Sequence, residues 1–268
     1  MTTGAAGWLG LDDKVCAVTG AAGGLGQAIA REFARNGAAV ALLDVNAEGC
    51  AALAAEIIAA GGRAAAIPCD VTDDASVAAA ADQCAATHGG CDVLVNNAGI
   101  LRPGRLEDLS MADWQKLLDI NLTGYLRCSQ AFGKPMLARG SGAIVHIASI
   151  AASHPQPYSG AYSPSKSAVV MLSRQIAYEW GPKGVRSNVV SPGLVRTPLS
   201  EAFYQQPGVL ERRNQAIPTR RICQPEDIAD ASAFLASRRA AHVNGQEIVV
   251  DGGLSQVLMS TVPRPGFE

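Results

Sequence analysis

Short apolar runs that alternate with segments of helical spacing constrain this chain more than any other feature. Seven runs are predicted to be strands: residues 14–19, 38–44, 64–69, 92–95, 143–148, 185–190 and 245–250. Six segments are predicted to be helices: residues 25–36, 47–60, 74–87, 111–137, 161–180 and 225–236. Strands that are apolar almost throughout, separated by helices, are typical of a parallel sheet covered on both faces. We therefore expect an α/β fold of one domain over residues 1–268, with a doubly wound, mostly parallel seven-stranded sheet.

Composition excludes several classes of protein. A chain of 268 residues that is 48% hydrophobic and 17% charged is not intrinsically disordered, and it can bury a core without disulfides or metal. A formal net charge of −2 provides no electrostatic footprint for nucleic acid or an anionic membrane. Seven cysteines without a C-x-x-C pair indicate free thiols, a reducing compartment and no metal site. With neither a signal-peptide pattern nor an apolar run of membrane-helix length, we expect a cytoplasmic protein.

A glycine-rich turn joins the first predicted strand to the first predicted helix. Residues 19–26 read Thr-Gly-Ala-Ala-Gly-Gly-Leu-Gly, in which Gly20, Gly24 and Gly26 form G-x-x-x-G-x-G and Leu25 lies between the last two. Glycines let the backbone approach a pyrophosphate, and a helix N-terminus offers that anion free N–H groups and a positive dipole end. The context after a buried strand predicts a dinucleotide at this turn.

An acid ends the second predicted strand, eighteen positions after Gly26. The carboxylate of this residue, Asp44, is placed to accept hydrogen bonds from the adenosine ribose, and it would repel a 2′-phosphate. Because no Lys or Arg follows directly, the sequence predicts NAD as the cofactor and disfavours NADP.

Polar and small residues also follow the third and fourth predicted strands. Asp70 precedes Val71, and its carboxylate either binds the adenine amino group or caps the next helix. Asn97, Ala98 and Gly99 follow the fourth strand, where glycine lets a ribose pack against the chain.

A second set of residues predicts proton-transfer chemistry. Tyr162 and Lys166 are four positions apart, so on a helix the phenol and the ammonium share one face. A nearby ammonium favours the phenolate, and we expect it to lower the phenol pKa from about 10 toward neutrality. Tyr162 then serves as general base for an alcohol or general acid for a carbonyl. Ser149 ends the fifth strand and is expected to orient the substrate oxygen, while Asn121 is expected to hold a water near Lys166.

Together these motifs resemble the short-chain dehydrogenase/reductase family from about residue 12 to residue 253. The resemblance rests on residues 19–26 and 96–99, on Asn121, Ser149 and residues 162–166, and on Ser191-Pro192-Gly193 and Asp251-Gly252-Gly253. It implies a Rossmann fold and hydride transfer to or from nicotinamide by a catalytic tetrad of Asn121, Ser149, Tyr162 and Lys166. It also implies that Lys166 bonds the nicotinamide ribose, that Pro192 and Gly193 border the cofactor, and that Val195 and Thr197 hold the carboxamide. Ser187 departs from the branched apolar residue that is more usual before Asn188.

The predicted substrate site draws on the loops that follow the strands and on a lid over residues 194–221. Its expected lining is Ser149, Ala151, His154, Gln156, Tyr162, Leu194, Leu199 and Phe203. This mixture favours a small, mainly apolar secondary alcohol or ketone, with His154 either a polar handle or an exposed loop residue.

Two other functions remain open at this point. A 3-oxoacyl-thioester reductase that uses an acyl carrier protein or CoA would prefer NADPH, which Asp44 disfavours. A dinucleotide-sensing protein without turnover would have a damaged tetrad, whereas all four residues are present. The resemblance further implies a homotetramer, with the helices that carry Asn121 and Tyr162 at one interface. The last strand and helix 225–236 form the other, and the tail 254–268 is expected to cover a neighbouring subunit.

Overall fold

Seven parallel strands form one sheet in the order β3-β2-β1-β4-β5-β6-β7. This computed structural model describes residues 7–197, 200–201, 204–258 and 262. The strands are β1 (Val15–Thr19), β2 (Ala39–Asp44), β3 (Arg63–Pro68), β4 (Val93–Asn96), β5 (Gly142–Ile147), β6 (Val185–Pro192) and β7 (Glu247–Val250). The order reverses between β1 and β4, so the sheet is doubly wound, as the sequence predicts.

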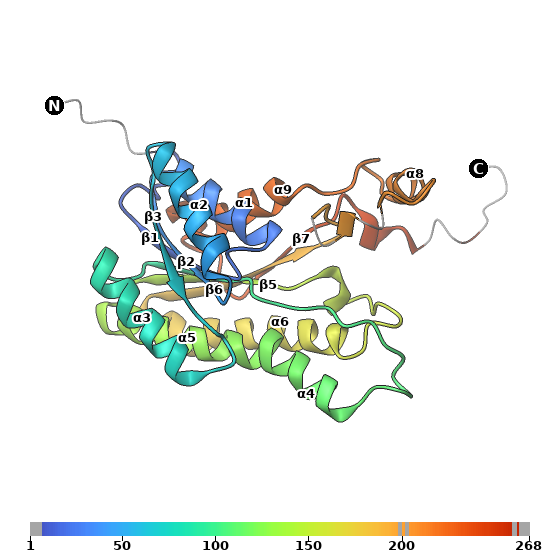
Figure 1. Ribbon diagram of the computed structural model, residues 1–268, viewed down its shortest axis with the longest axis horizontal. Coiled ribbons are helices and arrows are strands. Elements are labelled where there is room, and N and C mark those ends of the chain that lie inside the picture. Colours follow the sequence, from blue (N-terminus) through green and yellow to red (C-terminus); the bar gives the residue numbers. More distant parts are fainter. Residues whose placement is uncertain (1–6, 198–199, 202–203, 259–261, 263–268) are drawn as a thin grey trace.

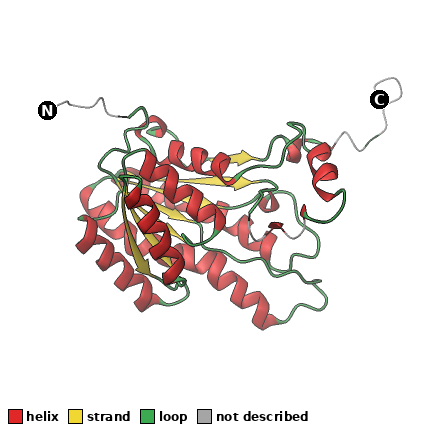
Figure 2. Cartoon of the chain, turned by 45° about the horizontal axis from the view of Figure 1, so that its top comes forward, coloured by secondary structure: helices red, strands yellow, loops and turns green. Residues whose placement is uncertain are grey.

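Helices cover both faces of this sheet, as Figures 1 and 2 show. The α-helices are α1 (Gly24–Arg35), α2 (Ala47–Ala59), α3 (Asp74–His88), α4 (Met111–Leu118), α5 (Gly124–Arg139), α6 (Tyr162–Trp180), α8 (Val209–Ala216) and α9 (Pro225–Ala236). In Figure 1, α1, α2 and α9 lie above the sheet, and α3, α5 and α6 lie below it. Because side chains alternate along a strand, Cys16 and Val18 of β1 pack into one core layer and Val15 and Ala17 into the other.

The segment predicted as one helix over residues 111–137 is interrupted. Between α4 and α5 lies a π-helical turn, η1 (Asp119–Thr123), and the buried Asn121 sits at its centre. A π turn accommodates one extra residue per turn and shifts the side chains that follow it, and such turns are frequent at functional sites. The apolar spacing alone does not reveal this interruption.

The segment predicted to be a lid, residues 194–221, contains helix α8. The start of this segment is joined to residues just beyond its end, because Val195 forms an isolated β-bridge with Cys223. A small apolar cluster of its own includes Tyr204, Ile217 and Ile222. The sequence does not predict α8, because this helix is short and polar and its sequence carries no apolar stripe.

The unusual Ser187 has a local explanation in the core. Its hydroxyl lies 2.8 Å from Ser173 Oγ and 3.2 Å from His146 Nε2, all within the buried core. A buried hydroxyl is tolerated when it is hydrogen-bonded, and these contacts satisfy it. All seven cysteines are buried and free, as predicted. Within the described ranges, no helix has the length and hydropathy that crossing a membrane would require.

Candidate active site

The glycine-rich turn after β1 and the loop after β4 touch closely. Gly20 has φ +65°, and a Cβ there would lie 2.8 Å from Ala98 Cα. A Cβ on Gly26 would lie 2.1 Å from the Gly20 carbonyl oxygen. Only glycine fits both positions without moving backbone, which explains two of the predicted cofactor residues.

Side chains at the ends of β1 and β4 fasten these two loops together. Thr19 Oγ1 accepts hydrogen bonds from the backbone N–H groups of Asn97 at 2.9 Å and Ala98 at 3.0 Å. Asn97 Nδ2 donates in return to the carbonyls of Thr19 at 2.9 Å and Gly20 at 3.1 Å. Asn97 therefore shapes the cofactor loop through its side chain. This role of Thr19 is not predictable from the sequence, in which its only signal is a hydroxyl at a strand end.

The start of α1 is suited to an anion. Gly23 is the N-cap, no described side chain caps this terminus, and the first turn holds no acid. The N–H groups of Gly24, Leu25 and Gly26 precede the first intrahelical hydrogen bonds, so they have no acceptor within the helix. Free N–H groups at a helix start fit a pyrophosphate.

Asp44 lies directly beside this turn. Its Oδ2 accepts from the Ala22 N–H at 3.0 Å and its Oδ1 from the Asn46 N–H at 2.9 Å. Each carboxylate oxygen has two lone pairs, so both oxygens retain capacity for ribose hydroxyls. The ribose-binding role of Asp44 stays a prediction.

Asp70 is not the cap of α3. Asp73 caps that helix by accepting from the N–H groups of Ala75 and Ser76, so the capping interpretation is wrong. Asp70 Oδ1 instead accepts from the N–H and the hydroxyl of Thr72, and these bonds lower the pKa of its carboxyl. The side chain is exposed, whereas Val71 is buried against the start of α5.

Ser149 and Tyr162 meet where β5 and α6 approach each other. Ser149 precedes the short helix η2 (Ile150–Ala152), and its Oγ accepts from the Ala151 N–H at 3.1 Å. Burial raises the pKa of the Tyr162 phenol, and a hydrogen bond with Ser149 opposes this rise. The protein's own groups therefore shift the pKa of Tyr162 upward. This direction is opposite to the sequence expectation, because burial outweighs the hydrogen bond with Ser149.

Asn121 connects the β4 loop to α6. Its Oδ1 accepts from the Ile100 N–H at 2.8 Å, and its Nδ2 donates to the Ile100 carbonyl at 2.9 Å and to Ser165 Oγ at 3.3 Å. A Cβ on Gly99 would lie 3.3 Å from Asn121 Oδ1 and 3.6 Å from Lys166 Nζ. The fold therefore brings the predicted cofactor loop and two of the predicted tetrad residues into contact.

Lys166 is 4% exposed and lies one helical turn after Tyr162, with Nζ 5.7 Å from the centre of the phenol ring. Nζ donates to the Ile147 carbonyl at 2.9 Å and to the Tyr125 hydroxyl at 3.4 Å. Burial lowers the pKa of this ammonium to about 7. Tyr125 is a contact that the sequence analysis misses, although its position four residues after Asn121 puts both on one helix face.

The residues predicted to line the substrate site do not all gather around Ser149 and Tyr162. Ala151 is buried, whereas His154 and Gln156 are exposed, so the exposed-loop alternative describes His154. Leu194 is half-buried in the small lid cluster, and Leu199 and Phe203 lie outside the described residues. Past Leu194, the Thr197 N–H donates to Ser200 Oγ at 2.9 Å, which shapes the first turn of the lid.

The end of β6 borders this lid. Pro192 is the last residue of the strand and pairs with Val250 of β7. The Gly193 N–H donates to the Val250 carbonyl at 2.9 Å. Both residues therefore lie at the same edge of the sheet as the glycine-rich turn.

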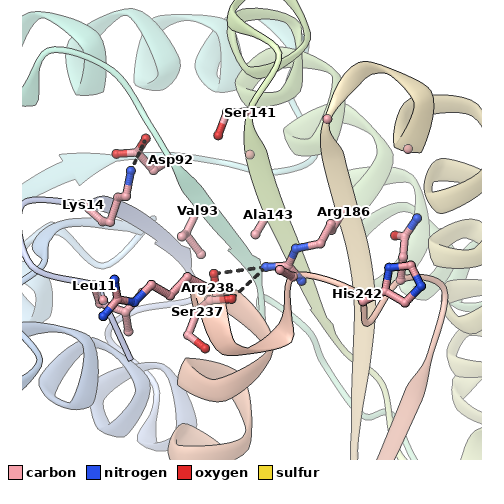
Figure 3. Close-up of a pocket in the computed structure, with 17 residues that line it drawn as sticks. Leu11, Lys14, Asp92, Val93, Ser141, Ala143, Arg186, Ser237, Arg238 and His242 are labelled. Carbon is pink, nitrogen blue, oxygen red and sulfur yellow. Dashed lines mark hydrogen bonds and ion pairs between the residues drawn. The ribbon is translucent and has the colours of Figure 1, made fainter. Parts of the chain in front are cut away.

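A hollow of about 720 Å³ lies at the opposite edge of the sheet, at the amino ends of the strands (Figure 3). Lys14 pairs there with Asp92 at 3.7 Å. Arg186 donates to the carbonyls of Leu235 at 2.8 Å and Val243 at 3.2 Å, holding the end of α9 against β6. Ligands in doubly wound sheets bind beyond the carboxyl ends of the strands, so this hollow has no part in the dinucleotide site.

Most of this chain is similar to known proteins. The family described as enoyl-(acyl carrier protein) reductase matches residues 20–255. A D-threitol dehydrogenase of Mycolicibacterium smegmatis is 47% identical over 91% of this chain and 93% of its own. A cis-4-hydroxycyclohexanecarboxylate dehydrogenase of Sinomonas cyclohexanicum is 42% identical over 91% and 98%.

A solved structure with the same fold is a gluconate 5-dehydrogenase of Burkholderia cenocepacia in complex with NADP and tartrate. Its TM-score is 0.87 at 35% identity, over 91% of this chain and 96% of that one. Other similar structures hold NADH or NAD. These three similar structures thus hold nicotinamide dinucleotides.

Proposed function

Because the chain belongs to the short-chain dehydrogenase/reductase family, we propose that it transfers a hydride between NAD and a small, mainly apolar secondary alcohol or the corresponding ketone. The observation that carries this proposal is the convergence of Ser149, Tyr162, Lys166 and Asn121 beside the loop that Gly99 ends. A non-catalytic sensor would not need a complete set of these groups in contact.

The dinucleotide fits the residues present. The uncapped start of α1 would hold its pyrophosphate, Asp44 its adenosine ribose, and Lys166 its nicotinamide ribose. Val195 and Thr197 would hold the carboxamide. When bound, nicotinamide supplies the hydride acceptor and, in its oxidised form, a positive charge. All other steps belong to side chains of this chain.

In the proposed oxidation, Tyr162 takes the hydroxyl proton of the alcohol while Ser149 orients the substrate oxygen. The Lys166 ammonium favours the phenolate and so offsets the upward shift that burial imposes on the Tyr162 pKa. Asn121 positions the Ile100 loop and, through Ser165, the first turn of α6.

The proposal is tested by following nicotinamide absorbance across three substrate groups, with NAD and NADP for the alcohols and polyols and with NADH and NADPH for the thioesters. These are cyclic and open-chain secondary alcohols, polyols, and 3-oxoacyl thioesters. Fastest turnover of a secondary alcohol with NAD supports the proposal. A polyol is the second candidate, because the D-threitol dehydrogenase is 47% identical to this chain. Preference for a thioester with NADPH, or no turnover at all, contradicts the proposal.

Replacing Asp44 with alanine is expected to reduce the preference for NAD over NADP by about tenfold to a hundredfold. Hydrogen bonds to a charged group contribute roughly 1.5–3 kcal/mol, and the repulsion of a 2′-phosphate disappears with the carboxylate. The measurement is the ratio of kcat/KM for the two cofactors in one preparation. Loss of the hydrogen bonds from Ala22 and Asn46 is expected to change kcat/KM for both cofactors by the same factor, so it leaves the ratio unchanged.

Asp44→Asn serves as a matched control for shape, since it keeps the side-chain size and removes the charge. It is expected to change the ratio in the same direction by a smaller factor. An unchanged ratio in both variants would exclude Asp44 as the cofactor-selecting residue.

We propose a homotetramer as the assembly. Large apolar side chains on α4, α5 and α6, namely Met111, Leu126 and Met171, are exposed, and Val249 of β7 is exposed on another element. In the proposed assembly these side chains lie at the interfaces between the subunits. Sedimentation velocity is expected to find four chains of 27.6 kDa per particle. Met171→Glu is expected to yield smaller particles, whereas Ile58→Glu on α2 leaves the tetramer intact; a stable monomer of the unaltered chain refutes the assembly.

A further inference from the structure

Few groups stabilise the positive charge of Lys166. The ammonium is buried, and its hydrogen-bond acceptors are the Ile147 carbonyl and the Tyr125 hydroxyl. No acidic side chain of the described residues forms an ion pair with it. Burial lowers the pKa of Lys166 to about 7, so each remaining dipole has a large effect on whether the side chain is charged.

The titratable groups that face Lys166 add no negative charge near neutral pH. From its own helix comes Tyr162, from α5 comes Tyr125, and from β5 comes His146. Burial raises the pKa of both phenols, and burial together with the charge of Lys166 lowers the pKa of His146 to about 3. Lys166 therefore depends on neutral acceptors.

Tyr125 is fixed in the orientation that makes its hydroxyl an acceptor. The side chain is 1% exposed, and its O–H donates to the Ile147 carbonyl at 3.0 Å. With the hydrogen directed to that carbonyl, the phenol oxygen presents lone pairs to Lys166 Nζ at 3.4 Å. The ring is stacked on His146, with centroids 5.9 Å apart, which prevents it from turning away.

We propose that Tyr125 is a positioning residue for Lys166. Its hydroxyl and the Ile147 carbonyl are the two hydrogen-bond acceptors of the ammonium. Together they stabilise its charged form and keep it directed toward Tyr162 and the Gly99 loop. In this way Tyr125 acts on the proton transfer through Lys166 without touching the reacting atoms. Its effect on turnover rests on the proposed function, whereas its effect on Lys166 does not.

The first test reads Lys166 directly and needs no turnover. The chain has five lysines, so protein labelled with ¹³C at the lysine ε-carbon has five signals, and Lys166→Met identifies the one of interest. In Tyr125→Phe the titration midpoint of this signal is expected to fall by about one pH unit, because a hydrogen-bond acceptor of the charged form is lost. Tyr178→Phe, which removes an exposed hydroxyl from the same helix as Lys166, is expected to leave it unchanged.

Tyr125→Phe is suitable because it keeps the ring and its stack on His146. The Ile147 carbonyl also keeps Lys166 as a donor, so no buried polar atom loses its only partner. A thermal melt checks that the variant is folded. A midpoint that coincides in Tyr125→Phe and the unaltered chain overturns the proposal.

The second test is the pH profile of kcat/KM for alcohol oxidation. With Lys166 less charged, more phenol stays protonated, so the acid limb is expected to move to higher pH and activity at pH 7 to fall about tenfold. A purely structural role would lower the profile at every pH without moving this limb, and that result overturns the proposal. If the unaltered chain oxidises no alcohol, the proposed function fails, and the lysine titration alone decides the role of Tyr125.

Discussion

Tyr162→Phe is expected to lower kcat for alcohol oxidation by about 10²–10⁴-fold, the range typical of general acid–base catalysis. Phenylalanine cannot take the substrate proton, yet it fills the same space at the first turn of α6. The NAD dissociation constant, measured by titration calorimetry, is expected to stay within a few-fold. Lys166, which would hold the nicotinamide ribose, keeps its contacts with Ile147 and Tyr125 in this variant.

The matched control is Tyr178→Phe, which removes a hydroxyl from an 85% exposed position of the same helix. It is expected to retain full activity. If Tyr162→Phe retained activity comparable with the control, another group would be the base, and the assignment of Ser149 as its partner would fail with it.

Gly26→Ala is expected to weaken NAD binding by at least about 100-fold. An added Cβ would lie 2.1 Å from the Gly20 carbonyl oxygen. The Cβ position is fixed by the Gly26 backbone and the oxygen belongs to the Gly20 backbone, so neither can yield without opening the turn. Opening the turn separates the Gly20 backbone from the Ala98 loop and misdirects the N–H groups at the start of α1. Overpacking of this kind also lowers the free energy of unfolding by about 1–3 kcal/mol, which a denaturant titration measures.

Gly23 is the control in the same turn. Its φ is −79°, and a Cβ there would meet only the Gly20 carbonyl, at the ordinary contact distance of 3.4 Å. Gly23→Ala is expected to bind NAD with an affinity within a few-fold of the unaltered chain. If a folded Gly26→Ala bound NAD as tightly as Gly23→Ala, the pyrophosphate would have to lie elsewhere.

The sequence and the structure agree where the signal is local. Apolar runs such as residues 14–19 specify buried strands because period and side-chain type act over a few residues. The four-residue spacing of Tyr162 and Lys166 specifies a shared helix face for the same reason. The absence of an apolar stripe, by contrast, hides α8 inside the predicted lid, and a π turn between α4 and α5 does not interrupt the apolar spacing of residues 111–137.

The pKa of Tyr162 illustrates a different limit. The sequence shows that Lys166 is near and therefore predicts a lower value, but it does not show how deeply the phenol is buried. Burial depends on elements that come from distant parts of the chain, and in the protein's own environment it raises the pKa. Proximity along a helix was predictable, and desolvation was not.

The sequence by itself determines the doubly wound fold, the glycine-rich turn and the identity of the residues proposed for chemistry. These depend on patterns within single strands, helices and turns. Only the tertiary structure decides that Thr19 forms hydrogen bonds with Asn97, that Asn121 forms them with Ile100 and Ser165, and that Tyr125 accepts one from Lys166. The physical reason is that each of these contacts joins residues more than twenty positions apart, and only the packing of whole elements brings such groups within hydrogen-bond distance.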